Sequence, residues 1–338
     1  MSRLLRTLLI IPSAILGILL LLPLVVPLPP LRDTVPPQQL ADPDSLFAEV
    51  RGVLLHKKLA GPSEPCYLLL HGFASSVFSW REVLHPLGAQ SLTVAYDRPG
   101  FGLTERPMPG EWTDENPYSP SFQADLAVGL MDRLGMERAI LVGNSAGGAI
   151  AIHAALEYPE RVAALVLISP ALYSGSSGGR SRWLPQWLAP LAATPQLRRI
   201  GPLLVRNIQT WARDLAERSW HDPSKITDDL WPGYLMPLKA ENWDRAFWEF
   251  LLASEPLDVT GRLGELTMPI LVITGDDDRV VPTEQTIQLA GGWKDARLVV
   301  LPECGHVPQE ECPGAFLEAI EDFVGKLELP KAAPSTVP

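Results

Sequence analysis

The sequence contains little cysteine, and its few cysteines fit no metal-binding pattern. Cys66, Cys304 and Cys312 are the three cysteines in 338 residues, and their spacing matches neither a zinc site nor the framework of a disulfide-rich domain. We therefore expect no metal, and we expect buried thiols without a chemical role. The alternative is a Cys304–Cys312 bridge, which would form in an oxidising compartment.

Clustered positive charge is also missing. Lys and Arg number 28 against 39 Asp and Glu, for a formal net charge of −11. Adjacent basic residues occur as short pairs such as Lys57-Lys58 and Arg198-Arg199, which we expect on solvated surfaces. Because clustered Lys and Arg are needed to bind phosphate backbones, the composition excludes a nucleic-acid partner.

One long hydrophobic run is present, at the N-terminus. Arg3 and Arg6 precede an apolar stretch that extends from about Thr7 to Leu31. About 20 apolar residues rising ~1.5 Å each cross the ~30 Å core of a bilayer, whereas a cleaved signal peptide has a shorter apolar region. We predict a transmembrane signal anchor over residues 1–31, with secretion after signal cleavage as the alternative.

The flanking charges predict the orientation of this anchor. Positive residues favour the cytoplasmic side of a membrane helix. Arg3 and Arg6 precede the span, whereas Arg32 after it is offset by Asp33. We expect a single-pass membrane protein with a cytoplasmic N-terminus, the rest of the chain lying on the outer or luminal side. Residues 32–45, rich in Pro, Gln and Asp, are predicted to be a linker.

The remainder of the chain alternates strands with helical segments. Six runs are predicted as strands, most of them apolar enough to be buried on both faces: residues 66–70, 92–96, 139–142, 162–168, 270–274 and 297–301. Residues 46–59 predict a strand pair that bends near Gly52. The pattern predicts an α/β fold, a mostly parallel sheet with helices on both faces, whose core comprises residues 46–170 and 267–328.

Residues 171–266 interrupt this alternation. The segment lacks strand-like runs and holds seven of the ten tryptophans. An insertion of this length after a core strand predicts a helical cap over the carboxyl ends of the strands, where open α/β sheets bind ligands. We expect most of these tryptophans to pack the cap and some to line an apolar pocket. Residues 329–338 are predicted to be a flexible tail.

A serine between glycines follows the third of these predicted strands of the core. In Gly143-Asn144-Ser145-Ala146-Gly147 the chain would pass from strand to helix in a sharp turn that strains the serine and exposes its hydroxyl. Such a hydroxyl becomes nucleophilic only with a base that a carboxylate orients. His306 follows the last predicted strand, and Asp276, Asp277 and Asp278 follow the one before it. Candidates for both roles are therefore present.

These motifs resemble those of α/β-hydrolase-fold serine hydrolases, in the branch that includes esterases and meta-cleavage-product hydrolases. The resemblance covers about residues 46–327 and implies the α/β-hydrolase fold with a helical cap, without cofactor or metal. Its motifs are His71-Gly72-Phe73, Asp97-Arg98-Pro99-Gly100-Phe101-Gly102, Gly143-Asn144-Ser145-Ala146-Gly147-Gly148, Gly275-Asp276-Asp277-Asp278-Arg279-Val280-Val281-Pro282 and Gly305-His306.

The resemblance also implies roles for individual residues. Ser145 would be the nucleophile, His306 the general base and then acid, and Asp278 the carboxylate that fixes the imidazole tautomer. The backbone N–H groups of Phe73 and Ala146 would form the oxyanion hole.

Two further elements of the resemblance are expected to be structural. His71 is a second candidate for the general base, but it lies at a strand end within the oxyanion motif, where a structural role is expected. The Asp97 to Gly102 segment resembles a structural turn of the family.

The leading hypothesis is therefore an ester or similar acyl hydrolase that forms an acyl-enzyme on Ser145. The tryptophan-rich cap and the membrane segment suggest a small apolar ester or a lipid-like substrate. The alternatives are a carbon–carbon bond hydrolase of the meta-cleavage type and an acyltransferase. A non-catalytic binding protein is disfavoured because all three triad residue types are present. The sequence does not predict the oligomeric state.

Overall fold

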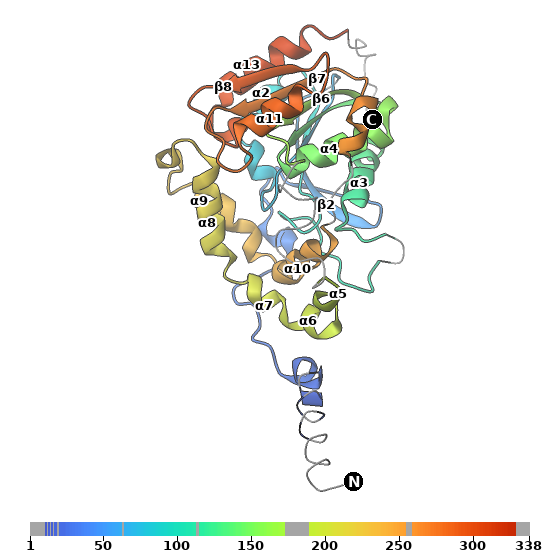
Figure 1. Cartoon of the computed structure of the whole chain (residues 1–338), viewed down its shortest axis with the longest axis vertical. Coiled ribbons are helices and arrows are strands. Elements are labelled where there is room, and N and C mark those ends of the chain that lie inside the picture. Colours follow the sequence, from blue (N-terminus) through green and yellow to red (C-terminus); the bar gives the residue numbers. More distant parts are fainter. Residues whose placement is uncertain are drawn as a thin grey trace.

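The computed structural model describes residues 11, 13, 15, 17–18, 20–62, 64–112, 115–172, 189–254 and 259–328. Within these residues the chain forms one large sheet with helices on both faces and a group of shorter helices at one end (Figure 1). The predicted tail and residues 173–188 of the predicted cap lie outside the described part of the chain.

The sheet has eight strands in the order β1-β2-β4-β3-β5-β6-β7-β8. β1 and β2 form the predicted strand pair, joined by Arg51 and Gly52, whose φ angles of 50° and 77° suit a two-residue hairpin turn. From β4 to β8 all neighbouring strands are parallel. The strands are β1 (Leu46–Val50), β2 (Val53–Ala60), β3 (Tyr67–Leu70), β4 (Thr93–Tyr96), β5 (Ala139–Asn144), β6 (Val162–Ile168), β7 (Ile270–Gly275) and β8 (Arg297–Leu301).

The central strands are apolar throughout because both of their faces are covered. In β3, Leu68 belongs to a cluster with residues of α3, α4 and α11, whereas its neighbour Leu69 belongs to a cluster with residues of α2 and α13. The covering helices are α2 (Leu84–Gly88), α3 (Pro120–Arg133), α4 (Ala146–Glu157), α11 (Thr283–Ala290) and α13 (Pro313–Val324). Each large aliphatic side chain buried in this way contributes about 1.5–3 kcal/mol, so the ends of the strands are held in place.

Between β6 and β7 the described residues form helices joined by turns and irregular segments. Figure 1 places α5, α6, α7 and α10 at the end of the molecule from which the N-terminal segment extends. The buried tryptophans Trp220, Trp231, Trp243 and Trp248 pack within this region. The helices are α5 (Ala189–Ala192), α6 (Pro195–Ile200), α7 (Pro202–Val205), α8 (Ile208–Ser219), α9 (Trp231–Leu235) and α10 (Trp243–Ala253).

The N-terminal segment lies against these helices. Arg199 and Arg206 donate hydrogen bonds to the carbonyl oxygens of Val26 and Pro29, at 3.0 and 2.6 Å. Among the described residues, no helix combines the length and the apolar character needed to cross a membrane, so the predicted transmembrane helix is not found there. Residues 1–10, 12, 14, 16 and 19 of the predicted anchor lie outside the described part of the chain.

Cys304 and Cys312 form a disulfide, with their Cα atoms 6.3 Å apart. The expectation of idle thiols is therefore wrong for this pair, because the chain after β8 turns back and brings the two residues together. Cys66 is a buried free thiol. Burial raises its pKa to about 11, so the thiol stays protonated and unreactive at neutral pH.

Candidate active site

Ser145 lies in the turn between β5 and α4. Its backbone has φ 52° and ψ −118°, a conformation that residues with a side chain rarely adopt. The neighbouring glycines permit the turn: a Cβ on Gly143 would come within 2.6 Å of the Gly147 carbonyl oxygen, and a Cβ on Gly147 within 2.1 Å of the Leu70 carbonyl oxygen. Strand, turn and helix together hold Ser145 at the carboxyl edge of the sheet.

His306 and Asp278 form a buried pair. His306 Nδ1 lies 2.8 Å from Asp278 Oδ2, and the two side chains are 6% and 0% exposed. The second carboxylate oxygen, Oδ1, accepts hydrogen bonds from the N–H groups of Val280 and Val281, both at 2.9 Å. Because these backbone bonds orient the carboxylate, Oδ2 faces the imidazole. A proton on Nδ1 then leaves Nε2 as the basic nitrogen.

The other two aspartates of the same loop have different partners. Asp277 forms an ion pair with Arg279 and a hydrogen bond with His221 Nδ1 at 2.9 Å. Asp276 accepts a hydrogen bond from a backbone N–H at 3.4 Å. Of the three aspartates that follow β7, Asp278 is the one that pairs with the imidazole of the candidate base.

Asn144 connects the serine turn to the histidine loop. Its Nδ2 donates hydrogen bonds to the carbonyl oxygens of His306 and Ile168, at 3.1 and 3.4 Å. Since Asn144 immediately precedes Ser145, these bonds tie the strand of the candidate nucleophile to the loop of the candidate base. The sequence motif includes Asn144, but its spacing alone does not reveal this role.

The two predicted oxyanion donors adjoin Ser145. Ala146 is the first residue of α4, so its N–H lies at the positive end of the helix dipole, where helical amides lack partners within the helix. Gly72, which precedes Phe73, lies against the serine: a Cβ there would be 3.4 Å from Ser145 Cβ. Backbone N–H groups placed in this way can stabilise charge that develops on a substrate carbonyl oxygen.

His71 is buried and neutral. Its Nε2 accepts a hydrogen bond from the Arg98 N–H at 3.0 Å, so its Nδ1 carries the proton and donates to the Gly72 carbonyl oxygen at 2.8 Å. Burial, followed by the charge of Arg98, lowers the pKa of His71 to about 3. With both ring nitrogens occupied, His71 shapes the turn that carries Phe73 and does not compete with His306 as a base.

Phenylalanines from the core and the cap meet beside the oxyanion motif. The ring of Phe73 lies 5.9, 5.6 and 5.8 Å from the rings of Phe101, Phe247 and Phe250. Phe247 and Phe250 belong to α10. We call these four side chains the aromatic cluster. Phe73 is partly exposed and the other three rings are buried, so the cluster is a mostly buried apolar group beside the residue whose N–H would bind the oxyanion.

Two buried arginines, Arg98 beside the Phe101 ring and Arg106, donate to the protein through their terminal nitrogens, and the Nε of each is buried without a partner. Arg98 donates to the carbonyl oxygen of Gly72 at 3.0 Å and to Gln123 Oε1 at 2.8 Å. Arg106 donates to the carbonyl oxygen of Gly102 at 2.6 Å. Burial lowers the pKa of both guanidinium groups to about 10, so both remain charged at neutral pH. They stabilise the turns around the site.

A carboxylate that the sequence did not single out ties the histidine loop to the cap. Glu311 Oε2 accepts hydrogen bonds from the N–H groups of Gly305 and His221, at 2.8 and 2.9 Å, and Oε1 accepts one from Asp222 at 2.8 Å. Gly305 precedes His306, and the other two donors follow α8. The sequence signal is weak, because an acidic residue at the start of a helix is common.

Comparison with known proteins agrees with this architecture. The family model described as alpha/beta hydrolase fold matches residues 68–313. The fold, the strained serine turn and the buried histidine–aspartate pair define a hydrolase of this class. The chain belongs to the α/β-hydrolase-fold family.

Relatives within the family include enzymes named as dienoate hydrolases and as meta-cleavage product hydrolases. A 2-hydroxy-6-oxo-6-phenylhexa-2,4-dienoate hydrolase of Comamonas testosteroni is 31% identical over 280 residues, which cover 80% of this chain and 91% of that protein. A solved meta-cleavage product hydrolase of Pseudomonas fluorescens is 27% identical with a TM-score of 0.62, covering 83% of this chain and 97% of that one. A bacterial membrane phospholipase A shares the fold, at 22% identity and a TM-score of 0.66, covering 96% and 98%.

Proposed function

We propose that this protein hydrolyses carboxylic esters with apolar acyl groups, either small esters or lipid-like ones. The observation that carries the proposal is the site itself: a strained Ser145, a buried His306–Asp278 pair at the same edge of the sheet, and the aromatic cluster beside the oxyanion residues. The proposed chemistry requires neither a cofactor nor a metal.

The proposed reaction has two halves that both use His306. In the first, His306 Nε2 takes the proton of Ser145 Oγ as the oxygen attacks the ester carbonyl carbon. The N–H groups of Phe73 and Ala146 stabilise the oxyanion, and Asp278 stabilises the imidazolium. His306 then protonates the departing alkoxide. In the second half, a water molecule deprotonated by His306 attacks the acyl-serine, releasing the carboxylic acid and the free serine.

The contacts around the aromatic cluster favour a neutral acyl group. The substrate named for the Comamonas relative is a dienoate, and a buried carboxylate requires a cation or several N–H donors. Arg98, whose guanidinium lies 5.3 Å from the centre of the Phe101 ring, donates through its terminal nitrogens to groups of the protein, and its Nε is buried without a partner. The apolar rings instead suit an alkyl or aryl acyl chain.

Carbon–carbon bond hydrolysis of the meta-cleavage type is the second candidate. The 31% identity to the Comamonas testosteroni enzyme over most of both chains supports it. The same three residues would serve this reaction, with a carbon leaving group in place of an alkoxide. An acyltransferase would differ from both in passing the acyl group to an added alcohol in preference to water.

A substrate screen tests these candidates. The purified protein and its Ser145→Ala and His306→Ala variants would be assayed with aryl esters of graded chain length, with phospholipids and with a 2-hydroxy-6-oxo dienoate. We expect ester hydrolysis that Ser145→Ala and His306→Ala each reduce by at least about 10³-fold. Faster turnover of the dienoate than of every ester would assign the second function. Undiminished ester turnover in either variant would exclude the triad.

We also propose that the N-terminal segment anchors the protein as a single-pass membrane protein with a cytoplasmic N-terminus and the catalytic domain outside. Support comes from the apolar run after Arg3 and Arg6 and from the Cys304–Cys312 disulfide, which persists in oxidising compartments. The full-length protein should stay in the membrane pellet after alkaline carbonate extraction. Release into the supernatant would overturn the anchor and favour secretion.

A further inference from the structure

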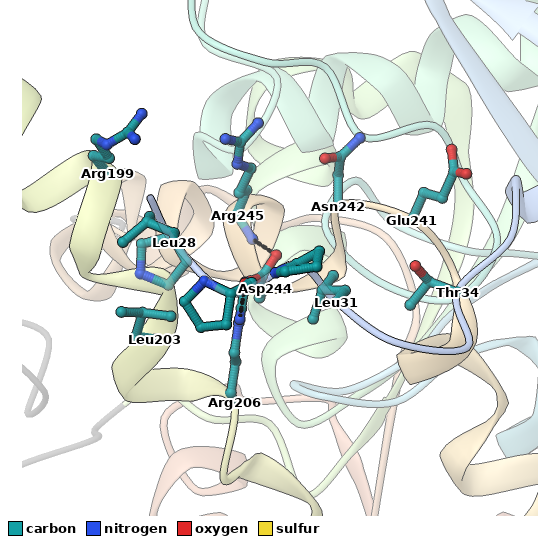
Figure 2. Close-up of a pocket in the computed structure, with 13 residues that line it drawn as sticks. Leu28, Leu31, Thr34, Arg199, Leu203, Arg206, Glu241, Asn242, Asp244 and Arg245 are labelled. Carbon is teal, nitrogen blue, oxygen red and sulfur yellow. Dashed lines mark hydrogen bonds and ion pairs between the residues drawn. The ribbon is translucent and has the colours of Figure 1, made fainter. Parts of the chain in front are cut away.

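A cavity lies where the N-terminal segment meets the cap. Its volume is about 280 Å³, and none of the candidate active-site residues lines it. The lining comes from residues 28–31 and 34 of the N-terminal segment, from α6, α7 and the residue after α7, and from residues 241, 242, 244 and 245 around the start of α10 (Figure 2).

Three arginines line this cavity, and two of them have donors to spare. Arg206 is committed: its Nε donates to Asp244 Oδ2 at 2.8 Å and its Nη1 to the carbonyl oxygen of Pro29. Arg199 uses one terminal nitrogen for a backbone carbonyl, but its Nε is buried without a partner. Arg199 as a whole is half-buried. Among the described residues, the Arg245 guanidinium has no ion-pair partner.

The arrangement of charges leaves these two guanidinium groups available for an anion. Figure 2 shows the side chains of Arg199 and Arg245 directed toward the same side of the view, with Glu241 beside Thr34 on the side away from Arg199. Asp244, the other acid of the lining, is neutralised by its ion pair with the third arginine.

The N-terminus of α10 also borders the cavity. Asn242 precedes the helix with φ 59° and lines the cavity. Asp244 Oδ1 accepts a hydrogen bond from the Arg245 N–H at 2.8 Å, so a carboxylate already lies in the first turn of this helix. The positive charge that remains for an anion therefore comes from the side chains of Arg199 and Arg245.

The cavity also adjoins an apolar helix. Residues 20–25 are helical, and Leu20, Leu21, Leu22 and Val25 are between 49% and 70% exposed. The lining residues 28–31 follow this helix within a few positions. A cationic site at the end of an exposed apolar helix lies at the depth of lipid phosphates when the helix enters a bilayer.

We propose that this cavity binds the phosphate group of a membrane glycerophospholipid, with Arg199 and Arg245 as its ligands. The inference rests on the proposed membrane attachment and is independent of the proposed ester hydrolysis. A lipid held there would bridge the N-terminal segment and α10, and α10 also supplies Phe247 and Phe250 to the aromatic cluster. Lipid binding would thereby fix the cap relative to the membrane surface.

Native mass spectrometry of the full-length protein in a mild detergent tests the proposal. We expect phosphatidylglycerol to bind and diacylglycerol, which lacks the phosphate, to bind at least tenfold more weakly. The double variant Arg199→Gln/Arg245→Gln should lose about tenfold or more in affinity for phosphatidylglycerol. Arg218→Gln, at an exposed cap arginine, is the matched control and should bind like the unmodified protein.

Two outcomes would overturn the proposal. Equal binding of diacylglycerol and phosphatidylglycerol would show that only apolar contacts hold the lipid. Binding of inorganic phosphate without any preference for the phospholipid would assign the site to free phosphate.

A thermal-shift measurement on the unmodified protein keeps the test independent of how the variants fold. Phosphatidylglycerol should raise the melting temperature and diacylglycerol should not; equal shifts would contradict the proposal.

An activity assay on the same samples, with a water-soluble aryl ester, separates the proposed lipid binding from the proposed ester hydrolysis. If the unmodified protein hydrolyses the ester but does not bind phosphatidylglycerol, only the proposed lipid site is contradicted. If it binds phosphatidylglycerol but does not hydrolyse the ester, only the proposed reaction is contradicted.

Discussion

The two oxygens of the Asp278 carboxylate have different partners, and this division orients the candidate base. Oδ1 is held by two backbone N–H groups, and Oδ2 faces His306 Nδ1 at 2.8 Å. A neutral amide in the same place would hold the side chain but not stabilise an imidazolium. The charge at Asp278, and not merely its shape, should therefore matter for the reaction.

Asp278→Asn should reduce kcat for an aryl ester by about 10³- to 10⁴-fold, because an amide favours the wrong imidazole tautomer. The matched control is Asp277→Asn in the same loop. Its side chain is 34% exposed and pairs with Arg279, so its loss should change kcat by less than about threefold. Steady-state kinetics at neutral pH check both values. A loss below tenfold for Asp278→Asn would contradict the assigned role.

His71 should make the folded protein sensitive to acid. Its pKa is about 3 in the folded protein and about 6.5 in an unfolded chain. Between these values the unfolded chain binds a proton that the folded protein does not, so stability falls as the pH drops below about 6.5 and continues to fall to about pH 3.

The variant His71→Gln keeps one donor and one acceptor but does not titrate. It should therefore lose about 2 kcal/mol less stability than the unmodified protein between pH 8 and pH 5. Urea unfolding at the two pH values measures the difference. Parallel pH profiles for the two proteins would show that His71 is not held neutral.

Among the elements, α12 (Pro308–Glu311) joins the histidine loop to the cap. Its last residue, Glu311, is 8% exposed and accepts hydrogen bonds from three backbone N–H groups. One of these belongs to Gly305 and two belong to the segment after α8. The position of His306 and the docking of the cap therefore depend on one carboxylate.

Glu311→Ala should lower kcat about tenfold or more, because displacement of a catalytic group by a fraction of an ångström is costly. The rate of fluorophosphonate labelling of Ser145 should fall in parallel, which separates this effect from weaker substrate binding. Glu318→Ala, at an exposed position of α13, is the control. An unchanged labelling rate in Glu311→Ala would show that the carboxylate does not position the base.

The helix α10 supplies two rings of the aromatic cluster and should influence chain-length preference. Phe247→Ala removes a ring 5.6 Å from that of Phe73 and would enlarge the space for the acyl chain. The ratio of kcat/KM for an octanoate ester to that for a butyrate ester should rise about tenfold. Leu204→Ala, at a residue of α7 that is 69% exposed, should leave the ratio unchanged. An unchanged ratio in Phe247→Ala would place the acyl chain elsewhere.

At the scale of the whole molecule, the oxidation state of the cysteines indicates whether the protein resides in an oxidising compartment. Cys304 and Cys312 are joined, and Cys66 is buried with a raised pKa. Protein isolated without reductant and treated with iodoacetamide should therefore remain unmodified while folded. After denaturation without reductant, only Cys66 should react, as peptide mass spectrometry would show. Labelling of all three cysteines would mean that the disulfide does not form where the protein resides.

Most of the core could be predicted because it depends on local signals. Continuous apolar runs predicted β3 to β7, since a strand covered on both faces has no polar side. The glycines around Ser145 predicted its turn, because a Cβ would meet backbone oxygens there. The cap could be predicted only as helical, since its packing joins residues far apart in the chain.

The sequence by itself determined the order of strands and helices, the serine turn and the candidates for base and acid, because each depends on neighbours within a few residues. The tertiary structure decided which of the three aspartates pairs with His306 and whether the cysteines are joined. It also placed Asn144 and Glu311 so that both form hydrogen bonds with the backbone of the histidine loop. It also gathered the aromatic cluster and the cationic cavity from the core, the cap and the N-terminal segment. These depend on contacts between residues separated by up to about 200 positions in the chain, and no local pattern encodes such contacts.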